Sequence, residues 1–378
     1  MTFFGRTKQR VCDSVNNRNI IVFHARGAQS HYVALEKLAN TRGWNVVYRE
    51  ANFVRSLGAG LLRRDRKRFS KALKNLEFCI RLAFGLIKTD ALVVGFAPYD
   101  WRPLVFSFGF SRNRVFLHTS WPDWSAADMP MGSFPANRAL WERIFLPNLK
   151  GIFFVTKHSK RSFLQQHYFE GTTSVVYHSY LQEYFFHFPR AATDTLRIGF
   201  AGRLVESKGL LKIIDIADHL KGTGIKIEIA GDGPDQEKLQ AVALEKGLNI
   251  KFLGRLTPEE LGAFFREIDI LLLPSIRTSR WEEAFGMVIV EAMACGVIPL
   301  ATDHAAPVEI LQCINPRWIF REDDYVNGTV DLIASYIQNR TALKKDRKIC
   351  ATEAEKYSVD SIAGSWSPIL ASFGDKPT

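Results

Sequence analysis

Two carboxylates in the second half of the chain have the spacing and setting of a site for an elongated, charged ligand. Glu283 and Glu291 frame the start of an apolar run in the segment EEAFGMVIVEAMACG. The run predicts a buried helix, and the helical part of their separation is about 7–8 Å. Between them lie the free N–H groups of the helix N-terminus, which bind phosphate. A nucleotide sugar, with hydroxyl groups at both ends and a diphosphate between them, would fit.

The spacing alone is not specific. Two other glutamate pairs share it, in polar helical stretches that predict solvated surface: Glu237 with Glu245, and Glu259 with Glu267. The segment around Glu283 differs because it lies between two apolar runs, 270–273 and 297–301, which predict buried parallel strands. Ligands of doubly wound sheets bind where loops leave the carboxyl ends of such strands.

Two cations upstream complete the set of residues for an anionic ligand. In GFAGRLVESKG, Arg203 and Lys208 flank a turn that follows the predicted strand 197–200. Arginine offers a planar fork of donors and lysine a point charge, a suitable pair for a departing diphosphate. The alternative is an ion pair with Glu206 on the surface.

These motifs, in this order, carry a resemblance to a known family. GFAGRLVESKG, IEIAGDGP, FLGRL and EEAFGMVIVEAMACGVIPLAT cover most of residues 196–311. They resemble the retaining, nucleotide-sugar-dependent glycosyltransferases of group 1, whose E-x7-E segment matches Glu283 to Glu291. The resemblance implies an α/β chain of the GT-B fold, with two Rossmann-like domains whose parallel sheets face each other across a cleft.

The resemblance also implies roles for individual residues. Glu291 would hold the ribose hydroxyls and Glu283 the hexose hydroxyls, while Arg203 and Lys208 would bind the donor pyrophosphate. The nucleobase would lie against the backbone from Phe252 to Arg255. The residues expected to bind the donor are Arg203, Lys208, Phe252, Leu253, Glu283, Ala284, Phe285, Gly286, Met287 and Glu291.

The first half of the chain resembles the family more loosely. Apolar runs at 19–24, 91–95, 115–118, 152–155 and 174–177 predict strands, which alternate with helices as in a Rossmann-like sheet. His118 ends one of these strands, and similar transferases carry a histidine there beside the sugar. On the residues alone a structural histidine is the more frequent case, and both interpretations stay open.

Loops of the first half supply the acceptor candidates. The stretch 118–134 breaks the alternation of strands and helices, and its Trp121 and Trp124 either stack on an acceptor or fill the core of the loop. Family members usually have a Gly-Gly pair in the first strand–helix loop, where this chain has Arg26-Gly27. Gly27 is therefore a weaker candidate for ligand contact.

A linker rich in polar and small residues at 184–195 divides the chain. We expect four parts: a tail at 1–18, an N-terminal acceptor-binding domain at 19–190, a C-terminal nucleotide-sugar-binding domain at 191–356, and a helix at 357–378 that returns to the first domain.

The net charge of +11 is concentrated in one place. The segment 62–88 pairs basic residues with apolar ones at helical spacing, which favours contact with an anionic membrane as much as a helix packed on the core. Binding to nucleic acid is the weaker interpretation, because no known binding module accompanies the charge. The membrane-surface candidates are Arg63, Arg64, Arg66, Lys67 and Arg68.

Cofactor chemistry is not expected. Asp323-Asp324 predicts a helix start and not a metal clasp, so we expect neither a metal nor another cofactor. The five cysteines form no CxxC pair, and the sequence has neither a signal-peptide core nor an apolar run of about 18 residues. These features favour a cytoplasmic protein, peripheral on the inner face of the cell membrane.

The sequence therefore predicts a retaining, metal-independent hexosyltransferase. Its donor would be a nucleoside-diphosphate sugar and its acceptor a glycan or lipid-linked sugar, in the synthesis of cell-envelope polysaccharide or glycolipid. His118, Glu283, Arg203 and Lys208 are the catalytic candidates. The alternatives are a sugar-nucleotide epimerase or phosphorylase of the same fold, and a non-catalytic adaptor bound to a membrane or to nucleic acid.

Overall fold

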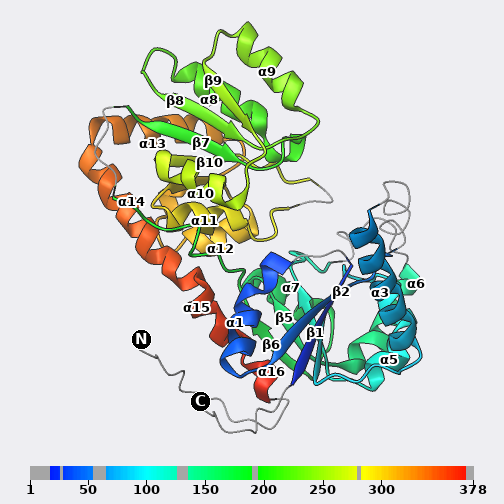
Figure 1. Cartoon of the computed structure of the whole chain (residues 1–378). Coiled ribbons are helices and arrows are strands. Elements are labelled where there is room, and N and C mark those ends of the chain that lie inside the picture. The colour runs from blue at the N-terminus through cyan, green and yellow to red at the C-terminus, as the bar shows by residue number, and fades with distance from the viewer. Residues whose placement is uncertain are drawn as a thin grey trace, which may run out of the picture.

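The structure is a computed structural model, and it describes residues 18–25, 29–53, 65–125, 135–189, 195–278 and 282–371. In these residues, two six-stranded parallel sheets lie in succession along the chain, each with helices on both faces (Figure 1). We call the first sheet with its helices the N-terminal domain and the second the C-terminal domain. The predicted fold class, α/β with two Rossmann-like sheets, is confirmed.

The N-terminal sheet has the strand order β2-β1-β3-β4-β5-β6, and all its pairs are parallel. Its strands are β1 (Asn19–His24), β2 (Asn45–Glu50), β3 (Ala91–Gly95), β4 (Val115–Thr119), β5 (Leu149–Phe154) and β6 (Thr172–Val175). Its helices are η1 (Gln29–Tyr32), α1 (Val33–Thr41), α3 (Arg66–Ala83), α4 (Arg102–Val105), α5 (Ser107–Ser111), α6 (Pro135–Leu140), η3 (Trp141–Phe145), η4 (Leu146–Asn148) and α7 (Lys157–Gln166).

The two faces of this sheet bury different residues because side chains alternate along a strand. On β1, Ile20 and Val22 pack on α1 and on the end of the chain, whereas Phe23 faces α3 and α5. β3 and β4 are buried along their whole length, which matches their continuous apolar sequences.

The C-terminal sheet has the order β12-β11-β10-β7-β8-β9. Its strands are β7 (Arg197–Ala201), β8 (Lys226–Ala230), β9 (Ile250–Gly254), β10 (Ile270–Leu273), β11 (Ile298–Thr302) and β12 (Ile319–Phe320). Its helices are η5 (Glu206–Lys208), α8 (Leu210–His219), α9 (Gln236–Glu245), α10 (Pro258–Glu267), α11 (Met287–Ala294), α12 (Ala305–Leu311), η6 (Pro316–Trp318), α13 (Tyr325–Gln338) and α14 (Arg340–Ala354).

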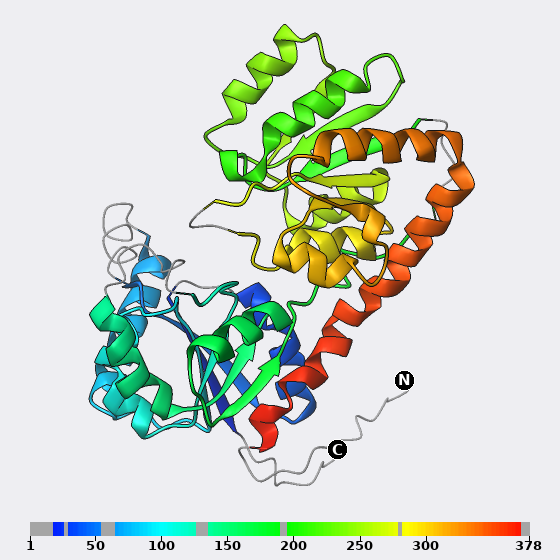
Figure 2. The same cartoon turned by 180° about the vertical axis from the view of Figure 1, so that it is seen from behind.

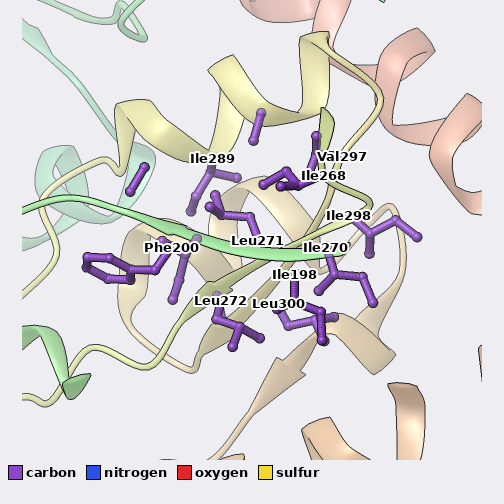
Figure 3. Packing of buried hydrophobic residues seen from close by; sticks show 14 of the residues in the cluster. Ile198, Phe200, Ile268, Ile270, Leu271, Leu272, Ile289, Val297, Ile298 and Leu300 are labelled. Atoms are coloured by element: carbon purple, nitrogen blue, oxygen red, sulfur yellow. The ribbon is translucent and has the colours of Figure 1, made fainter. Parts of the chain in front are cut away.

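The core around β10 fixes the position of α11. Figure 3 shows Ile289 of α11 next to Leu271, on one side of the sheet, while Leu272 and Leu300 point to the other side. All four side chains are buried. Because α11 rests on the centre of the sheet, its N-terminus is held at the carboxyl end of β10.

Two edge strands, β2 and β12, are absent from the strands that the sequence predicted. β2 is only partly buried and its sequence NVVYRE ends in charged residues, so its apolar signal is short. β12 has two residues, which is too few for a periodic pattern.

The end of the chain returns to the N-terminal domain. After α14 come η7 (Glu355–Tyr357), α15 (Val359–Ala363), η8 (Gly364–Trp366) and α16 (Pro368–Ala371). The indole of Trp366 is buried against Tyr32, His118 and Phe153. Figure 2 shows α14 and the elements after it running from one domain to the other.

This return crosses the domain boundary beside the first crossing. The N–H of Tyr180 donates to the carbonyl of Tyr357 at 3.1 Å, so the two crossing segments are hydrogen-bonded to each other. Among the described residues, no helix is both long and apolar enough to cross a membrane.

Candidate functional site

A pocket of about 480 Å³ opens at the carboxyl ends of β7 and β8 in the C-terminal domain. Arg203, Asp232 and Arg255 line it, together with Glu291 from α11. The backbone on one side is unusually close, since a Cβ on Gly231 would lie 1.8 Å from the carbonyl oxygen of Gly202. Only glycine allows the backbones of these two loops to approach so closely.

Glu291 is the carboxylate of this pocket. It lies in the second turn of α11, and no described residue forms a hydrogen bond or ion pair with it. Burial penalises the charged form and raises the pKa of Glu291 to about 7. The carboxylate is therefore an unsatisfied acceptor that a hydroxyl-bearing ligand would complete.

Lys208 and Glu283 form an ion pair beside Gly286 at the start of α11, with 22% and 18% of their side chains exposed. Lys208 comes from the turn after β7 and Glu283 from the loop after β10. A Cβ on Gly209 would lie 1.8 Å from the carbonyl oxygen of Pro274, so the two loops are in close contact. Lys208 thus pairs with Glu283 between the two loops.

Arg203 has an exposed side chain at the mouth of the same pocket. In the described part of the chain, no hydrogen bond or ion pair occupies its guanidinium. It remains available to an anion, as the sequence predicted for a diphosphate ligand.

A buried histidine that the sequence did not single out holds the loop of Glu283. The N–H of Glu283 donates to Nδ1 of His304 at 3.2 Å, and Nε2 of His304 lies 3.1 Å from the carbonyl of Ser275. These contacts require the proton on Nε2. Burial, with Arg277 nearby, lowers the pKa of His304, so the ring stays neutral and keeps this tautomer.

The remaining donor candidates divide into two groups. Met287 lines the pocket in the first turn of α11, and Gly286 precedes it with a φ of 72°, which glycine adopts without strain. Phe252 and Leu253 instead pack against the core, and the pocket wall in this region begins at Arg255. Side chains that pack on the core leave the backbone of this segment open to contact, so a nucleobase lying against the backbone from Phe252 to Arg255 stays a prediction.

The loop of Glu283 also touches the N-terminal domain. Phe285, which follows Ala284, is buried, and its ring lies 5.3 Å from that of His178 and 5.9 Å from that of Tyr177. The loop of Glu283 is therefore in ring contact with Tyr177 and His178.

His178 belongs to a second pocket, of about 550 Å³, at the carboxyl ends of β1, β3 and β4. Four histidines line it: His24, His31, His118 and His178. The ring of His178 lies 4.1 Å from His31 and 5.7 Å from His118. Within the described residues, no cluster of three or more His, Cys, Asp or Glu side chains has the geometry to hold a metal.

His118 is neutral in this pocket. Burial lowers its pKa well below the ordinary value, and the charges of His31 and His24 add to this effect. Its Nε2 atom is buried without a hydrogen-bond partner in the described structure. A buried nitrogen without a hydrogen-bond partner costs about 1–3 kcal/mol. The structure thus places His118 in the lining of a pocket. The sequence had left open whether this histidine lies beside a sugar or only supports the fold.

The two tryptophans of the 118–134 loop have different environments. Trp121 lines the histidine pocket and stays a candidate for ligand contact. Trp124 is buried between Trp141 and Phe163, and its Nε1 donates to Ser159 at 3.3 Å. Trp124 therefore fills the core of its loop, which is the second of the two alternatives that the sequence left open. Gly27 lies outside the described residues.

Glu309 of α12 joins the two domains. Its carboxylate accepts from the N–H groups of Lys157 and His158 at 2.7 and 3.0 Å, and from the hydroxyl of Tyr177 at 2.6 Å. A carboxylate at the N-terminus of α7 satisfies free N–H groups and the helix dipole. The contact fixes the domains to each other near Phe285.

The basic segment forms a shorter helix than expected. α3 spans Arg66–Ala83 and is capped by Asp65, which accepts from the N–H of Arg68. Arg66 and Lys67 are exposed and Arg68 is partly buried, while Arg63 and Arg64 lie outside the described residues.

Comparison with known proteins agrees with this geometry. Residues 183–357 match the family model of the glycosyl transferases group 1. An uncharacterised glycosyltransferase of Methanocaldococcus jannaschii is 30% identical over 181 residues, which are 45% of this chain and 43% of that protein. The lipopolysaccharide 1,2-N-acetylglucosaminetransferase of Salmonella typhimurium is 26% identical over 201 residues, 49% of this chain and 50% of that protein.

The chain spans half or less of the length of these two relatives. A solved structure covers more of it. Alr3699/HepE of Anabaena in complex with UDP superposes with a TM-score of 0.65 and 15% identity, over 94% of this chain and 100% of that one. This likeness concerns the fold. Residues 183–357 are thus similar to the glycosyl transferases of group 1, and the chain has the GT-B fold.

Proposed function

We propose that this chain is a retaining glycosyltransferase that moves a hexose from a nucleoside-diphosphate sugar to a glycan or lipid-linked acceptor. The observation that carries the proposal is the Lys208–Glu283 pair beside the N-terminus of α11. On one side of it is the pocket of Glu291, and on the other, through Phe285 and His178, is the histidine pocket.

The donor would lie along the first turns of α11. The ribose hydroxyls donate to Glu291 in the pocket, and the diphosphate lies at the helix N-terminus, within reach of Arg203 and Lys208. The hexose hydroxyls donate to Glu283. Lys208 then exchanges its ion pair with Glu283 for the diphosphate, so that neither charge is left without a partner.

Transfer of the hexose requires stabilisation of the leaving diphosphate. The bond between the anomeric carbon and the diphosphate oxygen breaks, and its electron pair stays on the diphosphate. The acceptor oxygen bonds to the same face of the anomeric carbon, and its proton passes to a diphosphate oxygen. Because Lys208, Arg203 and the N–H groups of α11 interact most strongly with the fully developed charge, they lower the barrier. These cations do the work of a divalent metal, and none is required.

The acceptor would occupy the histidine pocket. The neutral ring of His118, whose Nε2 has no described partner, suits a sugar hydroxyl, and Trp121 suits the apolar face of a sugar ring. The contact between Phe285 and His178 places this pocket next to the loop of Glu283.

The comparisons support the donor class and the biological setting. HepE has been solved with UDP and with UDP-glucose. A lipopolysaccharide transferase of Salmonella typhimurium and a putative colanic acid transferase of Escherichia coli are among the relatives. We infer a role in the synthesis of cell-envelope polysaccharide or glycolipid. The exposed Arg66 and Lys67 favour work on the anionic inner face of the cell membrane.

A test begins with a panel of nucleotide sugars. Binding is measured as thermal stabilisation, and turnover as release of the nucleoside diphosphate in the presence and absence of acceptors. UDP-glucose is the first member of the panel. Stabilisation together with slow donor hydrolysis supports a transferase, whereas a non-catalytic adaptor would respond to no member.

The variant Lys208→Ala tests the site itself, and Lys251→Ala is its control. Lys251 pairs with Glu228 on the outer strands of the same sheet, with 67% of its side chain exposed. We expect hydrolysis to be lost only in Lys208→Ala. Because that variant leaves Glu283 unpaired, Lys208→Ala combined with Glu283→Gln separates loss of catalysis from loss of stability.

A further inference from the structure

The N-terminal domain carries an apolar groove that the proposed reaction does not use. The groove has a volume of about 960 Å³ and runs between α3 and α4. Its walls expose large apolar side chains to water: Phe84 by 68%, Trp101 by 59%, Val105 by 52% and Ile80 by 50%. A contiguous apolar surface of this kind is unusual on a protein unless it binds something.

α3 has this surface in addition to its core-facing side. The helix buries Phe78, Cys79 and Leu82 against the sheet, so those residues account for its packing. Leu73 and Ile80, which also lie on α3, are 45% and 50% exposed. Packing against the core therefore does not explain why these exposed positions of α3 are apolar.

The groove leads into the histidine pocket. Asn52 and Arg102 line both cavities, and Nη1 of Arg102 donates to Oδ1 of Asn52 at 2.7 Å. The backbone beside them belongs to the strand ends of that pocket, because the N–H of Ala51 donates to the carbonyl of His24 at 2.8 Å. The two cavities therefore adjoin at Arg102 and Asn52, and a ligand that passes Arg102 would reach from the groove toward His118.

Arg102 places a positive charge where the groove adjoins the histidine pocket. The buried carboxylate of Asp100 holds its Nε and Nη2, and Asn52 takes one hydrogen of Nη1. Of its five N–H donors, two have no partner among the described residues. The donors available at the junction suit a phosphate or diphosphate group.

The rim of the groove favours an anion as well. Arg68, in the first turn of α3, is part of the lining. The acidic groups nearby are already paired, Glu50 with Lys71 at 2.8 Å and Glu77 with Arg81 at 3.2 Å. The occupant should therefore combine a hydrocarbon part with a negatively charged part.

We propose that the groove holds the hydrocarbon chain of a lipid-linked acceptor. The acceptor's phosphate or diphosphate linkage lies at Arg102, and its sugar enters the histidine pocket. This proposal rests on the proposed function, since it assigns the acceptor class of the same enzyme. It differs from contact with a bilayer surface because one lipid molecule leaves the membrane plane and fills a shaped cavity.

Alkyl phosphates test the groove without any reaction. Affinity for butyl, octyl and dodecyl phosphate is measured by calorimetry below their micelle concentrations. Each buried methylene is worth about fourfold in affinity, so octyl phosphate should bind at least about 16-fold more tightly than butyl phosphate if half of its extra methylenes are buried. Trp101 fluorescence should shift to shorter wavelength on binding, and Trp101→Phe should remove that shift.

Variants locate the two parts of the ligand. Ile80→Gln and Val105→Gln should abolish the dependence on chain length, and Leu244→Gln should not. Leu244 is a matched control because it is 82% exposed on α9 of the other domain. Arg102→Gln should weaken the binding of octyl phosphate until its affinity equals that of octyl glucoside, which has no phosphate.

The outcomes separate this proposal from the proposed function. If UDP-glucose or another nucleotide sugar is hydrolysed normally but affinity is independent of chain length, the groove proposal fails alone. Two other results would overturn it: binding of the groove to anionic vesicles with no affinity for single alkyl phosphates, or a dimer that Val105→Gln dissociates. If no nucleotide sugar binds while octyl phosphate does, the groove is a lipid site and the proposed function fails.

Discussion

The pKa of Glu291 leads to the sharpest prediction about the donor pocket. Burial raises this pKa from an ordinary value of 4.5 to about 7 in the free protein. In the proposed complex the ribose hydroxyls donate to the carboxylate, which favours the charged form and lowers the pKa again. A group whose pKa falls on binding releases a proton, so affinity for the donor should rise as the pH rises to about 7 and remain constant above it.

The magnitude follows from the same pKa values. The difference between 4.5 and about 7 corresponds to at most about 3 kcal/mol, at 1.36 kcal/mol for each pKa unit. The side chain is partly open to solvent through the pocket, which makes this an upper bound. If the ligand restores the ordinary pKa, affinity at about pH 8 should exceed that at about pH 5.5 by up to about 30-fold.

Calorimetry with an intact nucleotide sugar is the assay. Its diphosphate is esterified at both ends and does not titrate in this range, unlike that of a free nucleoside diphosphate. Glu291→Gln keeps the shape and removes the titration, so its affinity should be lower at high pH and independent of pH. Glu283→Ala should keep the pH dependence and bind a free nucleoside diphosphate almost as tightly as the unaltered protein.

Thermal unfolding gives a second readout without ligand. The folded-state pKa of Glu291 lies above its unfolded value, so its contribution to stability is present below about pH 4.5 and is lost as the pH rises through about 7. Glu291→Gln should therefore raise the melting temperature more at pH 8 than at pH 5. A pH profile of donor affinity that is parallel in the variant and the unaltered protein would refute the assignment of Glu291.

Three further predictions concern the leaving group, metals and the membrane. Lys208→Ala should lower turnover by about 10²–10³, the scale of one electrostatic donor worth about 2–4 kcal/mol, and near-normal activity would show that the cation is misassigned. Activity should survive EDTA, and loss in EDTA with recovery in Mg²⁺ or Mn²⁺ would count against the cationic site. Changing Arg66, Lys67 and Arg68 to Gln should weaken the binding free energy for anionic vesicles by about 1 kcal/mol per residue at low salt, as measured by cosedimentation. Equal binding of the unaltered protein to neutral vesicles would contradict the membrane placement.

Continuous apolar sequence made the central strands and α11 predictable. Residues 270–273 are all buried and so are most residues of the run after Gly286, so their continuous apolar sequence indicates buried elements. The edge strands β2 and β12 were missed because a half-exposed or very short strand has no continuous apolar run.

The site was predictable only where a motif is local. Arg203, Glu283 and Glu291 lie in motifs that can be found in one segment of sequence. The contacts between such residues cannot be predicted from one segment, because the Lys208–Glu283 pair joins loops 75 residues apart.

The histidine pocket and the role of Trp124 depend on tertiary packing. His178 lies after β6 and reaches His31 and His118 only through the sheet order. His304 follows a predicted strand, which is the one signal that could have identified it. Whether Trp124 faces a ligand or the core is decided by Trp141 and Phe163, which lie far from it in sequence.

The return of the chain to the N-terminal domain sets the order in which the protein can be completed during synthesis. One face of the first sheet is covered by Ile362, Trp366 and Leu370, while the sheet itself ends near Val176. At roughly 5–20 residues per second, about 10–40 s separate the synthesis of the sheet from that of its cover. During that interval Tyr32 and Phe153 have no Trp366 to pack against. The N-terminal domain starts first on the ribosome and is finished last, after the C-terminal domain has emerged.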